Sequence, residues 1–216
     1  MPDRLRKLDM ILGSYTNEKY KVLEKTLKRS NEEIIKDLIG SGLKGRGGAG
    51  FPTGLKWRLA AAAPGDEKYV ICNADEGEPG TFKDREILDC VPRKVLSAMA
   101  ICGKVIGAKK GYIYLRGEYK FLVPKLQAEI DLFHQVAKQF NLDFRIEIFL
   151  GSGAYVCGEE TALIQSMEGK RGEPRNKPPF PTQAGFKNMP TVVNNVETLA
   201  SALMVFKIGP EEFKKL

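Results

Sequence analysis

The sequence has few of the side chains that most often build catalytic and metal sites. Its 216 residues include one histidine, His134, four cysteines and one tryptophan. Because His134 lies on the polar side of a helical pattern, a histidine metal site or a Ser-His-Asp triad is disfavoured. Cys72, Cys90, Cys102 and Cys157 contain no C-x-x-C pair, and their spacings match no zinc or iron–sulfur framework. We therefore expect buried, reduced thiols and no metal site.

Long apolar segments are also missing. The longest apolar runs, such as residues 60–63 and 199–206, are far shorter than the ~18 residues that a membrane span needs. The first six residues contain no apolar stretch ahead of a small-residue cleavage site, so no secretion signal is indicated. We expect a cytoplasmic chain without disulfides and without a membrane span of its own.

The charge is positive overall but unevenly distributed. The chain has 34 Lys and Arg against 27 Asp and Glu, a formal net charge of +7. The whole surplus falls in residues 1–30 and 168–187, so no continuous basic stripe marks a nucleic-acid interface. With 43% hydrophobic and 28% charged residues the chain can form a core, and its length indicates a single domain or a domain with a small appendage.

Strand and helix patterns alternate along most of the chain. Buried or alternating strands are expected at residues 68–73, 111–115 and 143–150, and helices at residues 17–27, 31–39, 53–62, 92–106, 118–140, 158–167 and 194–208. Residues 170–190, rich in Pro, Gly, Lys and Arg, are expected to form a long ordered loop. The predicted fold class is α/β, a Rossmann-like parallel sheet with helices on both faces, preceded by an N-terminal helical segment. We place the helical arm at residues 1–42 and the α/β domain at residues 43–216.

Glycine is concentrated in one loop, where Gly45–Gly50 satisfies the pattern G-x-G-x-x-G. The dinucleotide fingerprint requires a preceding strand, and here a capped helix precedes the loop. The glycines still allow the backbone to lie against a flat or phosphorylated ligand, and the helix expected from Thr53 offers free N–H groups to an anion. Arg46 and Lys56 add positive charge. The alternative is a flexible surface loop.

Two expected strands run out into glycine-rich, acidic segments. The first strand is followed by residues 73–80 and the third by residues 151–160. In parallel sheets, ligands bind beyond the carboxyl ends of the strands, so both segments are candidates for one binding site. Alternatively, Asp75, Glu76 and Glu78 form an ordinary acidic turn, and Glu159 and Glu160 only meet a helix dipole.

Four blocks of this sequence resemble one family, the FMN- and NADH-binding flavoprotein subunit (51-kDa subunit) of complex-I-type NADH dehydrogenases. The family includes the diaphorase subunits of soluble NAD-linked hydrogenases and formate dehydrogenases. The similar blocks are Gly45–Trp57 (GRGGAGFPTGLKW), Cys72–Gly80 (CNADEGEPG), Gly151–Thr161 (GSGAYVCGEET) and Val192–Thr198 (VVNNVET).

The resemblance implies a role for individual residues. For FMN it implies contacts with Gly45, Arg46, Gly47, Gly48, Ala49, Gly50, Lys56, Asn73, Asp75, Glu76, Gly158, Glu159, Val193, Asn194, Asn195 and Thr198. For NADH it implies contacts with Phe51, Glu78, Tyr155, Glu160, Lys177 and Phe180. Glu78 resembles the carboxylate beside the nicotinamide and is the candidate catalytic residue. Phe51 and Phe180 resemble the rings that hold the adenine. A carboxylate at Glu160 accepts hydrogen bonds from a ribose 2′-hydroxyl and repels a 2′-phosphate, which favours NADH over NADPH.

The resemblance implies an NADH-oxidising module. A hydride passes from NADH to FMN, and electrons then leave one at a time to a partner, in the family a thioredoxin-like [2Fe–2S] subunit. Cofactors would be FMN and NAD(H), with a [4Fe–4S] cluster only if the chain is a fragment of a longer subunit; a minimal flavin module is the other possibility. The implied setting is a larger NADH dehydrogenase, hydrogenase or formate dehydrogenase complex, attached to the inner face of the cell membrane through partner subunits.

Two rival functions remain at this point. One is a non-catalytic flavin- or nucleotide-binding assembly module, and the other, less favoured, is a nucleic-acid binder that uses residues 1–30. The sequence also departs from the family at Leu59, where members often carry a third aromatic residue. That departure weakens the expected adenine slot.

Overall fold

The computed structural model describes residues 11–13, 20–151 and 153–216, and its centre is a four-stranded parallel sheet. The strands lie in the order β3-β2-β1-β4. Their bounds are β1 Tyr69–Ala74, β2 Lys110–Leu115, β3 Arg145–Leu150 and β4 Thr191–Asn195. Because every pairing is parallel, all four carboxyl ends reach the same edge, and there Asn73 of β1 is paired with Asn195 of β4. The predicted α/β fold class is confirmed.

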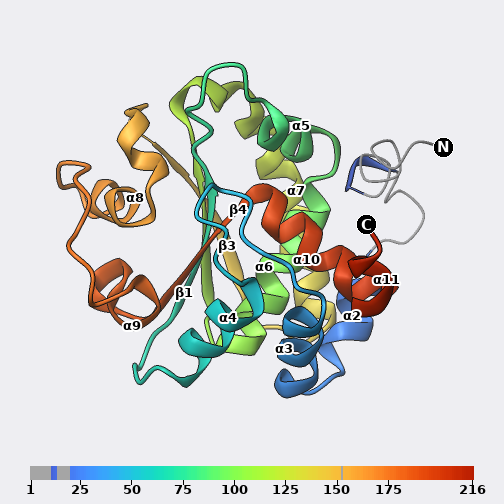
Figure 1. The fold of residues 1–216 in the computed structure, drawn as a ribbon. Coiled ribbons are helices and arrows are strands. Elements are labelled where there is room, and N and C mark those ends of the chain that lie inside the picture. Colours follow the sequence, from blue (N-terminus) through green and yellow to red (C-terminus); the bar gives the residue numbers. More distant parts are fainter. Residues whose placement is uncertain (1–10, 14–19, 152) are drawn as a thin grey trace.

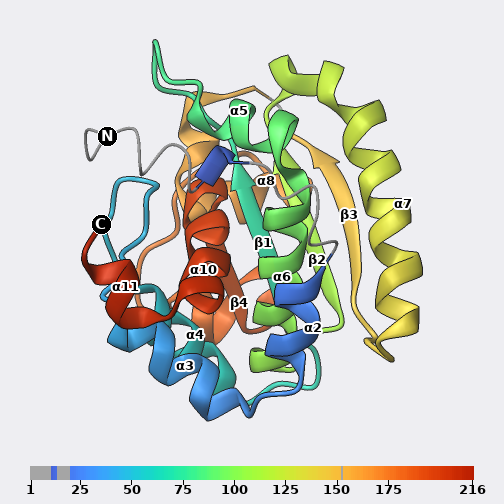
Figure 2. The same ribbon diagram turned by 90° about the vertical axis from the view of Figure 1, so that its right-hand side faces the viewer.

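Helices cover both faces of the sheet (Figure 1). Val70, Cys72 and Ala74 of β1 point into the larger hydrophobic cluster, and the alternate residues Tyr69 and Ile71 into the smaller one. Side chains on the larger-cluster side come from α2 Lys21–Leu27, α3 Asn31–Gly40, α4 Thr53–Ala62, α5 Lys83–Cys90, α6 Pro92–Ile106, α7 Val123–Gln139 and α10 Val196–Ile208. On the other side lie α8 Glu160–Met167 and the 3-10 turn η3 Phe186–Asn188. Figure 2 shows α6, α7 and α10 lying over the larger-cluster face.

Several predicted helices are confirmed together with the signals that set their ends. Ser30 caps α3: its Oγ accepts a hydrogen bond from the Glu33 amide at 3.2 Å, and its own amide donates to the Glu33 carboxylate at 2.8 Å. Helix α4 covers the expected residues 53–62. Helix α6 begins at Pro92 and ends before Gly107, whose φ of 80° is left-handed.

Other elements differ from the sequence prediction. Residues 191–195, partly expected in a helix from residue 194, instead form strand β4, which pairs with β1. Helix α10 starts only at Val196, because the Asn195 side chain caps it by accepting a hydrogen bond from the Glu197 amide at 3.0 Å. The expected helix at residues 118–140 begins as the 3-10 turn η1 Gly117–Leu122, and α7 follows with Pro124 in its first turn. The expected strand 143–150 starts at Arg145. Helices α5, α9 Pro181–Ala184 and α11 Pro210–Lys214 were not predicted.

The N-terminal helices pack into the larger cluster. Leu23 of α2 and Ile34 and Leu38 of α3 are fully buried there. Residues 17–19 of the helix predicted at 17–27 lie outside the described residues, as does most of the basic segment 1–30. The division at residue 42 into an arm and an α/β domain stays a prediction.

Helices α3 and α4 approach each other closely at Gly54. A Cβ on Gly54 would lie 2.6 Å from the Ile39 amide nitrogen, which is backbone and cannot move aside. We expect Gly54→Ala to lower the free energy of unfolding by about 1–3 kcal/mol because the two helices must separate. Chemical denaturation measures the loss. Gly40→Ala on α3 is the control, since its Cβ would lie at an ordinary 3.7 Å from Pro210; equal stability of the two variants would contradict the prediction.

Candidate functional site

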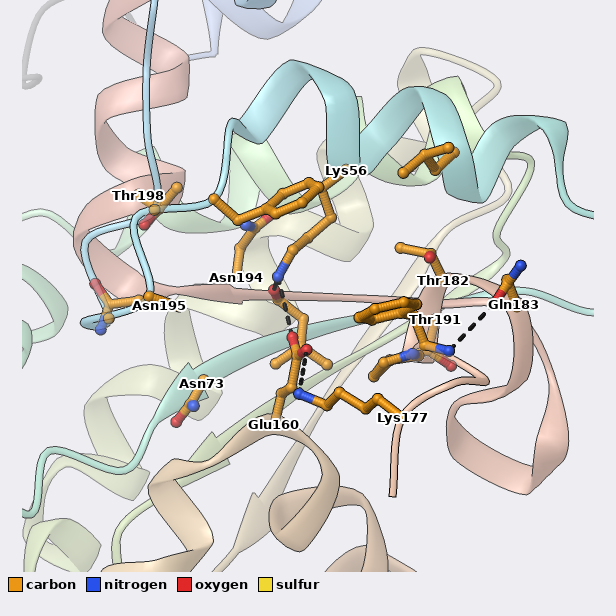
Figure 3. Close-up of a pocket in the computed structure, with 18 of the residues that line it drawn as sticks. Lys56, Asn73, Glu160, Lys177, Thr182, Gln183, Thr191, Asn194, Asn195 and Thr198 are labelled. Atoms are coloured by element: carbon orange, nitrogen blue, oxygen red, sulfur yellow. Dashed lines mark hydrogen bonds and ion pairs between the residues drawn. The ribbon is translucent and has the colours of Figure 1, made fainter. Parts of the chain in front are cut away.

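A cleft of about 950 Å³ opens beside the carboxyl ends of β1 and β4. It continues along α4 toward α9, with α4 on one side and β4 on the other (Figure 3). The predicted site residues that line it are Gly45, Gly47, Ala49, Gly50, Phe51, Lys56, Asn73, Gly158, Glu159, Glu160, Lys177, Phe180, Val193, Asn194, Asn195 and Thr198. This volume lies near the upper end of the ~300–1,000 Å³ typical of small-molecule and cofactor sites.

The glycine loop forms one wall of the cleft and is fixed at several points. Its base is closed by a hydrogen bond from the Gly45 amide to the Phe51 carbonyl at 2.9 Å. The Arg46 amide donates to Thr198 Oγ1 of α10 at 2.9 Å. A Cβ on Gly47 would lie 3.2 Å from Asn195 Cβ, and Gly50 has a left-handed φ of 64°. These contacts oppose the alternative of a flexible surface loop.

Two lysines and two glutamates form an ion-pair chain in the cleft. Lys56 Nζ lies 3.0 Å from Glu160 Oε2 and donates to the Val193 carbonyl at 3.0 Å. Lys177 Nζ lies 2.9 Å from Glu159 Oε1 and 3.2 Å from Glu160 Oε1, so Glu160 is held between the two cations (Figure 3). Burial acts to raise the pKa of Glu159, but hydrogen bonds from Thr161, Lys177 and the Ala162 amide outweigh it and lower that pKa. Lys56 and Lys177 thus place positive charge on two sides of Glu160, while the ion-pair chain of two lysines and two glutamates carries no net charge.

Two asparagines near the strand ends, Asn73 and Asn194, are held by side-chain hydrogen bonds. Asn73 Nδ2 donates to the Gly158 carbonyl at 2.8 Å, and its Oδ1 accepts from the Asp75 amide at 3.0 Å. Asn194 Oδ1 accepts from the indole N–H of buried Trp57 at 2.8 Å. Trp57 belongs to α4 and Gly158 to the segment before α8, so these two amides connect α4 and that segment to the ends of β4 and β1.

The aromatic pair predicted for adenine lines the cleft. Phe51 and Phe180 are 41% and 52% exposed, so both rings offer apolar surface in the lining of the cleft. Leu59 lines the same cleft and is 47% exposed, so the position where the family often carries an aromatic residue does face the candidate site. The three apolar side chains form a surface for a flat ligand.

Six predicted site residues lie outside the lining of the cleft: Arg46, Gly48, Asp75, Glu76, Glu78 and Tyr155. The Glu76 carboxylate is buried and accepts from the amides of Asp84 and Arg85, which places it at the start of α5. The Tyr155 hydroxyl donates to Glu78 Oε1 at 2.5 Å, and that hydrogen bond raises the pKa of Tyr155. These contacts indicate a structural role for Glu76. They also connect Glu78, which follows β1, to Tyr155, which follows β3.

Asp75 has an unusual environment. Burial raises its pKa to about 6, and its Oδ2 atom is buried without a hydrogen-bond partner among the described residues. Because buried polar atoms are nearly always paired, and because the Asp75 amide bonds to Asn73 of the cleft lining, this orphan acceptor is a candidate ligand contact.

Sequence reasoning missed one wall of the cleft. Its residues come from the end of α4, from α9 and from the start of β4, namely Ala62, Ala63, Pro64, Pro181, Thr182, Gln183 and Thr191. Gln183 Oε1 accepts a hydrogen bond from the Phe180 amide at 3.2 Å, which fixes the turn that carries the phenylalanine. The available signal was a proline in the first turn followed by Thr-Gln, but four residues are too few for a periodicity to be recognised.

In residues 11–13, 20–151 and 153–216, no group of three or more His, Cys, Asp and Glu side chains is arranged to hold a metal ion. No helix in that part of the chain has both the length and the apolar composition needed to cross a membrane. The four cysteines are free thiols, and Cys90 alone among them is exposed. His134 accepts a hydrogen bond from the Ile146 amide through Nε2 at 3.0 Å, a structural contact between α7 and β3.

Comparisons with known proteins agree on one family. A family model described as the Nuo51 FMN-binding domain matches residues 39–203. The chain is 48% identical over 202 residues to the NAD-reducing hydrogenase HoxS subunit alpha of Cupriavidus necator and 49% identical over 201 residues to an NADH-quinone oxidoreductase subunit of Aquifex aeolicus. It is 48% identical over 204 residues to the NADP-reducing hydrogenase subunit HndC of Solidesulfovibrio fructosivorans. These relatives are subunits of larger enzymes.

The matched regions cover almost all of this chain but only part of each relative. Each alignment spans 90% of this chain, and 34%, 47% and 41% of the hydrogenase HoxS, Aquifex and HndC proteins, respectively. A crystal structure of NAD+-reducing [NiFe]-hydrogenase in the H2-reduced state matches with a TM-score of 0.88 at 42% identity, over 98% of this chain and 36% of that chain. The sequence blocks, the parallel sheet and the cleft at its edge therefore agree, and the chain belongs to the family of Nuo51 FMN-binding domains.

Proposed function

We propose that this chain binds FMN and NADH in the cleft and oxidises NADH as one module of a larger electron-transfer enzyme. The observation that carries the proposal is the fixed glycine wall facing an ion-pair chain at the carboxyl ends of β1 and β4. Such an arrangement accepts a flat, phosphorylated ligand, because the glycines remove side-chain bulk and the lysines meet phosphate.

The residues present fit FMN. A Cβ at Gly47 would fill the narrow space between the glycine loop and Asn195, so the glycine keeps this part of the cleft lining free for a ligand. The orphan Asp75 Oδ2 has accepting capacity for a polar group of that ligand. We assign the FMN contacts to the glycine loop, Lys56, the strand-end asparagines, Asp75, the segment 158–159, Val193 and Thr198. When bound, FMN supplies the redox chemistry, since it accepts a hydride from NADH and releases electrons singly.

The chain's own contribution is orientation. We assign Phe51 and Phe180 to the adenine and Lys177 to the phosphates of NADH, because the exposed rings and the cation line the same cleft. We assign Glu78 and Tyr155 to the nicotinamide side, where the Tyr155 hydroxyl donates a hydrogen bond to Glu78 Oε1. Holding two reacting groups within ~3–3.5 Å is itself a large part of such catalysis.

Anaerobic titration of the reconstituted chain tests the proposal. After incubation with FMN and removal of free flavin, the protein should carry a flavin spectrum that bleaches when NADH is added without oxygen. Colourless protein would contradict the proposal. Bound flavin that NADH does not bleach would favour the alternative, a non-catalytic assembly module.

Nucleotide preference gives a sharper expectation. One relative is named an NAD-reducing and another an NADP-reducing hydrogenase, so preference differs among the matched proteins. We expect Glu160→Ala to lower the affinity for NADH relative to NADPH about ten-fold, because a carboxylate hydrogen bond to the 2′-hydroxyl is lost and a repulsion removed. Titrations of both nucleotides measure the ratio. Glu173→Ala is the control, because the Glu173 carboxylate pairs with Arg171 on the surface, outside the cleft. An unchanged ratio of NADH to NADPH affinity in Glu160→Ala would contradict this role of Glu160.

We further infer that the electrons leave to a partner iron–sulfur protein, a thioredoxin-like [2Fe–2S] subunit in the resemblance on which this inference rests. Support for a partner comes from the relatives, which are subunits of multi-subunit enzymes. The same relatives support a cytoplasmic position, peripheral at the inner face of the cell membrane through those partners. Co-purification of the chain with its complex tests both inferences.

A further inference from the structure

Asp84 is a buried charged residue with no part in the function proposed above. It lies in the first turn of α5 with 2% of its surface exposed, and it does not line the cleft. Both of its carboxylate oxygens are occupied. Lys83 Nζ lies 2.6 Å from Oδ1, and Asn195 Nδ2 donates to Oδ2 at 2.6 Å. The carboxylate therefore joins a lysine to an asparagine that does line the cleft.

The side-chain amide of Asn195 is held at both ends. While its Nδ2 donates to Asp84, its Oδ1 accepts from Lys83 Nζ at 3.1 Å and from the Glu197 amide at 3.0 Å. Lys83 Nζ also lies 3.3 Å from Glu197 Oε2. Since an amide that exchanged its oxygen and nitrogen would lose all three contacts, these partners admit one orientation of Asn195.

The same turn of α5 is attached to the neighbouring strand. Glu76, just beyond the end of β1, accepts hydrogen bonds from the amides of Asp84 at 3.0 Å and Arg85 at 3.3 Å. Asn195 is the last residue of β4, which pairs with β1. The first turn of α5 thus bridges the carboxyl ends of the two strands that border the cleft.

A buried carboxylate is costly unless it is paired. Burial raises the pKa of Asp84, against the opposing effect of Lys83, and Lys83 itself is only partly buried. An asparagine at position 84 has the same size, but it can offer an acceptor to Asn195 only by turning a donor toward Lys83, or the reverse. The ionised form is therefore the one that satisfies both neighbours at once.

We propose that Asp84 is a positioning residue for flavin binding, which acts by fixing the side-chain amide of Asn195 against the glycine loop, with Lys83 as its counter-ion. The proposal rests on the proposed function, because it assumes that FMN occupies the cleft. It predicts that the affinity for FMN depends on a charge that lies outside the cleft lining.

Flavin titration of matched variants tests the role. We expect Asp84→Asn to weaken FMN binding by about ten-fold or more, as expected when a hydrogen bond to a charged group is lost. Asp89→Asn is the control on the same helix, because the Asp89 carboxylate pairs with exposed Lys125 at 2.6 Å and not with Asn195. Quenching of flavin fluorescence by the apoprotein gives each dissociation constant. Equal affinity in Asp84→Asn and the wild-type chain would overturn the proposal.

A double-mutant cycle separates positioning from general stability. If Asp84 acts through Asn195, Asp84→Asn should have no further effect on FMN affinity in an Asn195→Ala background, whereas additive losses would overturn the proposal. If Asp84→Asn fails to fold, Lys83→Met takes its place in the cycle, because it removes the counter-ion of Asp84 and a contact to Asn195 at a side chain that is 38% exposed. If the wild-type chain fails to bind FMN, the proposed function falls; if the wild type binds and the cycle is additive, only the role of Asp84 falls.

Discussion

Gly47→Leu should leave this chain folded and unable to bind FMN. Gly47 and Asn195 both line the cleft, and a Cβ on Gly47 would already lie 3.2 Å from Asn195 Cβ, so a leucine must fill the lining of the cleft at this point and push Asn195 aside. Because Asn195 must move to admit the Cβ, we expect the free energy of unfolding of the apoprotein to fall by about 1–2 kcal/mol, a loss that leaves the chain folded. Flavin retained after gel filtration, together with chemical denaturation of the apoprotein, measures both quantities.

A graded series controls this experiment. Gly47→Ala adds only the Cβ, which requires Asn195 to move by a few tenths of an ångström, so FMN binding should be weakened and still measurable. If Gly47→Leu bound FMN as well as the wild-type chain does, the glycine loop would not be the cradle. If instead Gly47→Leu unfolded, the loop would be part of the packed core, contrary to its position at the surface of the cleft.

The sequence predicted those features whose causes are local. The capping box of Ser30 and Glu33 and the proline at the start of α6 are short-range signals, and both helices begin at the predicted residues. The parallel sheet also followed from the alternation of strands and helices. Strand β4 was missed because its five residues share a segment with the capped start of α10, and the helical pattern of Val196–Ile208 dominated the prediction.

The site was predictable as a set of residues, and its internal contacts were not. Trp57 and Asn194 lie 137 residues apart along the chain yet form one hydrogen bond. Asn73 and the Gly158 carbonyl are 85 residues apart. Such pairs depend on strand order, since β1 and β4 are neighbours in the sheet but far apart in sequence. For the same reason, neither the carboxylate of Glu76 at the start of α5 nor the contact of Asp84 with Asn195 has a signature in the sequence.

Lys56→Met should weaken FMN binding by about 2 kcal/mol, roughly 30-fold, as expected when one charge-assisted contact to an anion is removed. Lys56 lines the cleft with its Nζ 3.0 Å from Glu160 Oε2, and it is one of the two cations in the ion-pair chain of four charged residues. Its loss leaves Lys177 alone beside Glu159 and Glu160. The attraction between the cleft and a phosphorylated ligand is then weaker.

The salt dependence of binding distinguishes this electrostatic effect from a loss of packing. Because added salt screens the attraction between a cation and a phosphate, FMN affinity of the wild-type chain should fall as ionic strength rises, and that of Lys56→Met should fall less. Lys68→Met is the matched control: Lys68 donates to the Ala60 and Ala61 carbonyls near the end of the same helix and does not line the cleft. Parallel salt profiles for wild type and Lys56→Met would show that Lys56 does not meet the phosphate, and the FMN phosphate would then have to be assigned to another part of the glycine wall.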